Sequence, residues 1–199
     1  MNKPLTLIMA IAMAFASGNT PLTANDNVSS SLISLTASAS LQGKWITDAH
    51  QLVDDESANP FKTADLIFEF TQQKVKITMH LAGKLESDGI GMDLGIKMTA
   101  DYGYTKKGNT IELNANGSKP QFNLYKFKLE VDAETREGLK AAGITDEYFK
   151  KEFEKQFTAG EMNDLFNTME ATFTITSLTP TTLVLTDTDG ESLNFKRTK

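Results

Sequence analysis

Residues 90–104 alternate between apolar side chains and polar or small ones. Every second residue is apolar, and the positions between them hold glycine, threonine or a charged residue. Successive side chains of a β-strand point to opposite faces of the sheet, so this spacing predicts a strand with one dry face and one wet face. A strand of about fifteen residues is longer than usual, which favours a coiled or closed sheet over a flat one.

The same alternation recurs along most of the chain, broken by turn signals. Asn116-Gly117 and Asp189-Gly190 are typical of tight hairpin turns. Between Leu124 and Phe127 the apolar phase slips, which predicts a β-bulge or a bend. We expect strands at about 42–52, 65–71, 74–85, 90–104, 110–115, 121–131, 171–178, 182–187 and 192–197.

A helical period replaces the alternation after residue 131. We predict one helix capped by Asp132 and ending at Gly143, a second capped by Thr145 and ending near Gly160, and a short third helix at 162–169. Sequential strands joined by short turns favour an up-and-down arrangement, and closure removes exposed strand edges. The predicted fold class is therefore all-β: an antiparallel up-and-down β-barrel of eight or nine strands, with a helical insertion at about 133–168. A sandwich of two sheets is the alternative.

The N-terminus carries an export signal. Lys3 precedes an apolar run that ends in Ala14-Phe15-Ala16, a small-x-small cleavage pattern. This arrangement is typical of a secretory signal peptide, and the run is too short to span a bilayer. We expect a signal peptide at 1–16, a flexible tether at 17–40 and one domain at 41–199; a buried N-terminal helix is the alternative. No cysteine is present to take a lipid anchor, so we expect a periplasmic or secreted protein.

Composition narrows the classes of partner and chemistry. The formal net charge is −6 without a dense basic patch, so neither nucleic acid nor an anionic membrane is an expected partner. The absence of cysteine excludes thiol chemistry. His50 and His80 lack the spacing of a metal site, and no Gly-x-Ser-x-Gly motif occurs. We therefore expect no catalytic residues, no metal and no cofactor.

Two sequence features resemble a known family. Gly43-Lys44-Trp45 opens the first barrel strand, and Arg197 lies at the end of the last one. The chain is similar to the lipocalins, which carry a Gly-x-Trp signature here and a basic residue that stacks on the tryptophan. It looks most like the exported lipocalin-like proteins of Gram-negative, Bacteroides-type bacteria. The resemblance covers about residues 41–199 and implies that Trp45 and Arg197 form the barrel floor. The helical segment comes before the last three strands and there is no disulfide, which departs from the lipocalin pattern.

A barrel of this size can be filled by side chains or can hold one small ligand. Methionine adapts its shape and is favoured at permissive binding surfaces. The candidate lining residues, which share the apolar face of their strands, are Phe70, Met79, Met92, Met98, Tyr104, Phe122 and Phe173. Ordinary core filling is the alternative.

Phe149, Phe153 and Phe157 form an aromatic stripe on an otherwise charged helix. We interpret the stripe as a lid over the barrel mouth or as a face for a protein partner; packing on its own sheet is the alternative. The leading hypothesis is an exported, non-enzymatic barrel that binds a small apolar or amphipathic molecule. The second is an interaction or inhibitor module, in which the barrel is a rigid scaffold and the helices and the 54–62 loop contact an envelope protein.

Overall fold

The computed structural model describes residues 39–49, 61–87, 90–115, 120–158 and 170–199. Its strands are β1 (Gly43–Asp48), β2 (Phe61–Phe70), β3 (Lys74–Ser87), β4 (Ile90–Lys107), β5 (Thr110–Asn114), β6 (Gln121–Glu130), β7 (Glu170–Leu178), β8 (Thr182–Thr186) and β9 (Ser192–Thr198). The described helices, α2 (Ala133–Ala141) and α3 (Asp146–Thr158), lie between β6 and β7. The predicted signal peptide, most of the tether, His50, most of the 54–62 loop and the third helix lie outside the described residues.

Eight strands close into a ring. Around the ring the order is β1-β2-β3-β4-β5-β7-β8-β9, with β9 pairing back to β1 and every pair antiparallel. Neighbours in the ring are neighbours in the chain apart from β6, so the connections run up and down. The structure therefore confirms the predicted antiparallel barrel and excludes the sandwich.

The ninth strand, β6, lies outside this ring. β4 has 18 residues, and two strands share one of its edges: β5 pairs with 103–107, and β6 pairs with 91–99. Because both run antiparallel to β4, they point in the same direction, and the hairpin predicted at Asn116-Gly117 is wrong. The second edge of β5 is taken by β7, whereas β4 is long enough to pair with β6 beyond the end of β5.

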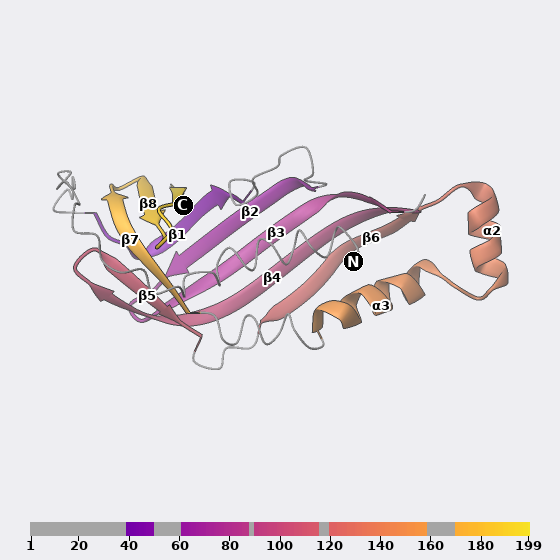
Figure 1. Ribbon diagram of the computed structural model, residues 1–199, viewed down its shortest axis with the longest axis horizontal. Coiled ribbons are helices and arrows are strands. Elements are labelled where there is room, and N and C mark those ends of the chain that lie inside the picture. The colour runs from indigo at the N-terminus through magenta and orange to yellow at the C-terminus, as the bar shows by residue number, and fades with distance from the viewer. Residues whose placement is uncertain (1–38, 50–60, 88–89, 116–119, 159–169) are drawn as a thin grey trace.

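The barrel consequently has a long wall and a short wall. The long wall is β2, β3, β4 and β6, with 10 to 18 residues each. The short wall is β1, β5, β7, β8 and β9, with 5 to 9 residues each. Pairing between β3 and β4 continues to Ser87 and Ile90, so the long wall projects beyond the ring. In Figure 1 its free end leads to α2, and α3 runs back towards the barrel along β6.

A bulge keeps the apolar face of the long wall in phase. The β4–β6 register shifts between Gly95 and Ile96, which confirms the bulge predicted between Leu124 and Phe127. The extra residue, Tyr125, covers Gly95, where a Cβ would lie 2.5 Å from the tyrosine ring. As a result, the apolar residues of β6 meet the inward residues of β4 in the pairs Phe122–Met98, Leu124–Ile96, Phe127–Leu94 and Leu129–Met92.

β2 begins at Phe61, earlier than the predicted start at Asp65. The sequence suggested a loop here because Pro60 precedes Phe61 and polar residues follow it. However, Phe61 and Ala64 are buried, and the register against β3 shifts between Phe61 and Thr63. This irregularity breaks the strict alternation on which the sequence-based boundary depended.

The helical insertion begins as predicted. The Asp132 carboxylate accepts the Thr135 N–H at 2.8 Å and caps α2. Ile144 N–H donates to the Leu139 carbonyl at 2.8 Å after the end of α2, and the Thr145 hydroxyl accepts the Tyr148 N–H at the start of α3. α2 contains no buried residue, whereas α3 packs on β6.

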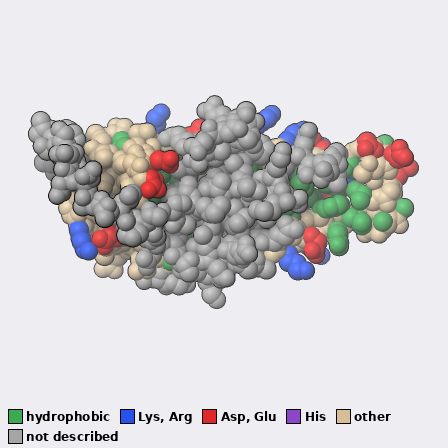
Figure 2. All heavy atoms as spheres, viewed as in Figure 1, with side chains coloured by type: hydrophobic (Ala, Val, Ile, Leu, Met, Phe, Trp, Pro, Cys, Tyr) green, Lys and Arg blue, Asp and Glu red, His purple; other side chains and the backbone are tan. Residues whose placement is uncertain are grey.

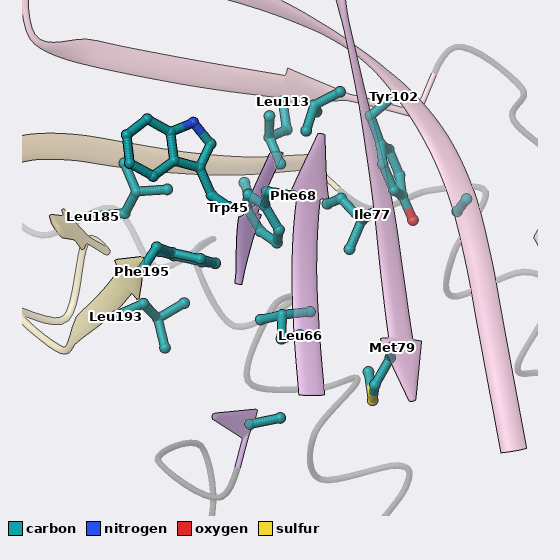
Figure 3. Close-up of a cluster of buried hydrophobic side chains, with 14 of the residues drawn as sticks. Trp45, Leu66, Phe68, Ile77, Met79, Tyr102, Leu113, Leu185, Leu193 and Phe195 are labelled. Atoms are coloured by element: carbon teal, nitrogen blue, oxygen red, sulfur yellow. The ribbon is translucent and has the colours of Figure 1, made fainter. Parts of the chain in front are cut away.

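The interior is apolar. Thr47 and Thr78 are the only polar residues buried in the part of the chain that the structure describes. Figure 3 shows the aromatic residues Trp45, Phe68 and Phe195 converging with leucines of β8 and β9, while Met79 lies apart from them on β3. Trp45, Phe68 and Phe195 therefore form the aromatic part of the core, and Met79 and Met98 of the long wall are buried in the same hydrophobic core.

Candidate functional site

Trp45 and Arg197 close one end of the ring, which we call the floor. They are cross-strand neighbours, and the guanidinium carbon lies 4.2 Å from the centroid of the indole ring. The guanidinium also donates to the carbonyl oxygens of Gln42, at 3.0 Å, and Ser40. The indole N–H donates to the Leu41 carbonyl at 2.7 Å. The floor therefore combines a cation–π stack with hydrogen bonds to the chain that enters β1.

Gly43 gives the Gly-x-Trp signature a local physical cause. Its φ angle is 121°, a conformation that disfavours any residue with a Cβ. A Cβ at this position would also lie 2.9 Å from Nη1 of Arg197. Glycine therefore makes room for the guanidinium that covers the tryptophan.

Above the floor, aromatic side chains fill the space inside the closed ring of strands. The centroid of Phe68 lies 5.0 Å from that of Phe195, 5.9 Å from Phe70 and 6.4 Å from Phe173. Tyr104 lies 5.3 Å from Phe70, and its hydroxyl donates to a backbone carbonyl at 2.7 Å. Three predicted lining residues, Phe70, Tyr104 and Phe173, thus belong to one aromatic cluster, as the core-filling alternative also requires.

Three other predicted lining residues lie together on the long wall. Met79 of β3 is directly opposite Met98 of β4, which is opposite Phe122 of β6. Leu66 of β2 is opposite Met79. We call these four residues the methionine row. It crosses the wall near the point where β4 changes partner from β5 to β6, at the upper rim of the ring.

Met92 lies farther out on the long wall. It precedes Met98 by six positions on β4, which corresponds to about 20 Å along a strand. Phe153 of α3 covers this part of the wall, because its ring centroid lies 6.5 Å from that of Phe127 on β6. Met92, Phe127 and Phe153 are all half-buried and pack against the core. Phe153 therefore packs on its own sheet and at the same time covers the outer part of the apolar surface.

The other members of the aromatic stripe do not share this position. Phe149 is half-buried and lies edge-on to the exposed Tyr148, with centroids 6.1 Å apart. Phe157 belongs to α3, but its side chain lies outside what the structure describes. Figure 2 shows apolar side chains gathered at this helical end of the molecule, next to acidic and basic ones.

Charged side chains lie on the outer face of the long wall. Asp93 contacts Lys126 at 2.7 Å, and Glu130 contacts Lys84 at 2.7 Å. Hydrogen bonds from these ammonium groups lower the pKa of both carboxyls. Within the described ranges, no charged residue is buried and no cluster of three or more metal-ligating side chains occurs. The described interior therefore offers an apolar contact surface.

Two residues, one on β6 and one on α2, were not predicted from sequence as part of a site. Phe127 was named only as the end of the phase slip, although its inward position follows once the bulge is placed. Arg136 donates to the Leu129 carbonyl and lies 3.3 Å from the Asp146 carboxylate. It thereby ties α2 to both β6 and α3, and no spacing signal identifies it because its partners come from separate elements.

None of the described helices combines the length and the apolar character needed to cross a membrane. Comparison of the chain with protein-family models and with curated proteins finds no match. The closed antiparallel barrel is consistent with a lipocalin-like fold. The resemblance to lipocalins thus depends on this architecture and on the residues of the floor.

Proposed function

We propose that this protein is an exported, lipocalin-like barrel that binds a small apolar or amphipathic molecule and catalyses no reaction. The methionine row is the observation that carries the proposal. Unbranched thioether side chains adapt to differently shaped guests, and no charged residue is buried around them in the described part of the chain. These methionines lie on the long wall, buried in the same hydrophobic core as the aromatic side chains of the ring.

Export and the lipocalin-like relationship belong to the same proposal. The apolar run before Ala14-Phe15-Ala16 supports export to the periplasm or beyond the cell. The stack of Arg197 on Trp45 supports the relationship, because it gives the Gly-x-Trp signature the partner that the family resemblance implies. N-terminal sequencing of the protein recovered from its host tests export: a start after Ala16 is expected, and a chain beginning at Met1 contradicts it.

Ligand binding is tested by two measurements on the purified protein. Native mass spectrometry of material from its own host should show a bound apolar molecule, and an uncharged dye such as Nile red should bind and be displaced by apolar competitors. Met98→Gln, which introduces a polar amide at nearly constant length, should weaken dye binding about tenfold or more. Lys97→Gln, on the exposed opposite face of the same strand, is the matched control. A protein that carries no ligand and binds no apolar probe would not fit the proposal.

The helical insertion favours a second candidate function, an interaction or inhibitor module. Tyr148 is 52% exposed beside Phe149, and α2 has no buried residue. In this case Tyr148→Asp should abolish capture of an envelope protein without changing the urea midpoint of unfolding. Tyr125→Asp, at a residue 55% exposed on the sheet, should leave capture intact. Loss of capture in both variants or in neither would remove this candidate.

A further inference from the structure

The barrel wall is continuous only over the height at which β4 pairs with β5. There each strand of the ring has a neighbour on both sides. On the N-terminal side of Gly103, β4 pairs instead with β6, which ends the sheet and has no second strand partner in the described part of the chain. The apolar face of the long wall therefore ends at one side in the edge of β6.

The edge of β6 is poorly suited to pair with another strand. The bulge at Tyr125 interrupts its regular hydrogen-bonding pattern, and Lys126 and Lys128 are exposed along it. Bulges and lysines are the features with which sheet edges avoid strand addition. This edge is therefore better suited to remain unpaired, as the side boundary of the apolar face, than to pair with an added strand.

α3 packs against β6 from the inner side, with Phe153 on Phe127. At the root of the hairpin formed by α2 and α3, Arg136 binds the Leu129 carbonyl and pairs with Asp146, whose side chain is 45% exposed. Exposed ion pairs contribute little to stability. An outward swing of α3 about this root would separate Phe153 from Phe127 and uncover the wall beneath.

The inner face of the long wall, which α3 covers at Phe127, is elongated and uncharged. It extends from the methionine row to Met92, about 20 Å along β4. Leu94, Ile96 and Leu124 between them are buried. The acidic and basic residues of the same strands, such as Asp93 and Lys126, pair on the opposite face. An ionised group placed against the inner face would lose its hydration without gaining a partner.

From these observations we infer that the ligand binds between the long wall and α3, above the closed ring, and that it enters from the side past β6. The ligand class is an elongated molecule without an ionised group. This inference depends on the proposed function, and adds to it the position of the site, the route of entry and the class of ligand.

A cross-linking experiment tests the route. The chain has no cysteine, so the double variant Phe127→Cys/Phe153→Cys carries the only two thiols. A short bis-maleimide then joins α3 to β6, and the same protein capped with N-ethylmaleimide is the matched control. We expect the association rate of Nile red to fall about tenfold or more in the cross-linked form only. Equal association rates in the two forms would overturn the lateral route.

Methyl NMR of the unmutated protein labelled at methionine tests the position of the site independently of folding defects. Adding Nile red or hexadecan-1-ol should shift the methyl signals of Met79, Met98 and Met92, assigned with Met→Leu variants. Hexadecanoate at neutral pH should compete about tenfold less well than the alcohol.

The NMR outcomes separate the inference from the function on which it depends. Shifts at Met79 and Met98 with an unmoved Met92 would place the ligand inside the ring and overturn the inference, while ligand binding itself would stand. Equal competition by hexadecanoate would overturn the uncharged ligand class. If no probe binds the unmutated protein, the proposed function fails together with the inference.

Discussion

The stack of Arg197 on Trp45 leads to a quantitative prediction that a double-mutant cycle can test. The cycle consists of Trp45→Leu, Arg197→Met and the double variant, in which apolar bulk is kept at both positions. The guanidinium carbon of Arg197 lies 4.2 Å from the centroid of the indole ring, and Trp45 is 0% exposed. The cation thus interacts with a ring that is shielded from water on its other sides, which strengthens the attraction.

The expected coupling free energy is about 1–2 kcal/mol, as for a partly desolvated cation–π contact. Trp45→Leu alone should lower the free energy of unfolding by roughly 2–4 kcal/mol, because a large buried body is lost and the Leu41 carbonyl loses its donor. Arg197→Met alone should lower it by about 1.5–3 kcal/mol, because the carbonyls of Ser40 and Gln42 lose a charged donor.

Urea unfolding followed by far-UV circular dichroism measures all four proteins on the same scale. Fluorescence is unsuitable for the cycle, since Trp45 is the only tryptophan, but it serves as a second readout in Arg197→Met. There the emission maximum should change, because an uncharged side chain replaces the cation over the indole face. A coupling below about 0.3 kcal/mol, within the additivity of independent sites, would refute the energetic role of the stack.

Three further predictions concern the long wall and the helices. Gly95→Ala should lower the free energy of unfolding by about 1–2 kcal/mol, because the new methyl group meets the Tyr125 ring. Adding Tyr125→Ala to this variant should restore part of the lost stability. An unchanged urea midpoint in the single variant would contradict the close contact. Burial raises the pKa of Tyr102, so the protonated phenol is favoured in the folded state. The free energy of unfolding should therefore stay constant below about pH 10 and fall as the pH rises above the pKa of tyrosine in the unfolded chain. Tyr102→Phe should flatten the fall of the urea midpoint between pH 9 and pH 11, roughly the range in which free tyrosine titrates, and an unaltered slope would count against burial as the cause. Asp132→Ala removes the cap of α2, so trypsin should cut faster at Lys140 while the urea midpoint of the barrel stays constant; an unchanged cleavage rate would show that the cap does not hold α2.

Much of the fold was predictable because the strands are half-buried and alternate in the sequence. The bulge near Tyr125 was also readable, since an extra residue shifts the apolar phase of β6. The pairing of β6 was not predictable, because the Asn116-Gly117 signal describes a local turn and says nothing about competing edges. β7 takes the second edge of β5, and β4 is long enough to pair with β6 beyond the end of β5.

The sequence predicts which residues share the apolar face of the candidate site, but it does not predict how they are arranged in space. Alternation identifies Met79, Met98 and Phe122 as members of one face, but their alignment in a single row depends on the register between three strands. Phe70 carries the same sequence signal, yet the structure places it in the aromatic cluster of the ring. Phe70 and the methionine row differ in their position along the barrel axis. The alternation of apolar residues predicts which face a side chain lies on, but not this position.

The division of the β4 edge also has a consequence for dynamics. Strands of the ring are hydrogen-bonded along both edges, whereas β6 in the described structure is bonded along one. Detaching β6 breaks a single ladder and leaves the closed circuit complete, so the two regions can open with different free energies. Backbone amides of β6 should therefore exchange with deuterium well before those of β9. The extended strand β4 thereby connects the closed ring, which keeps its shape, to the region around β6, which can change its shape.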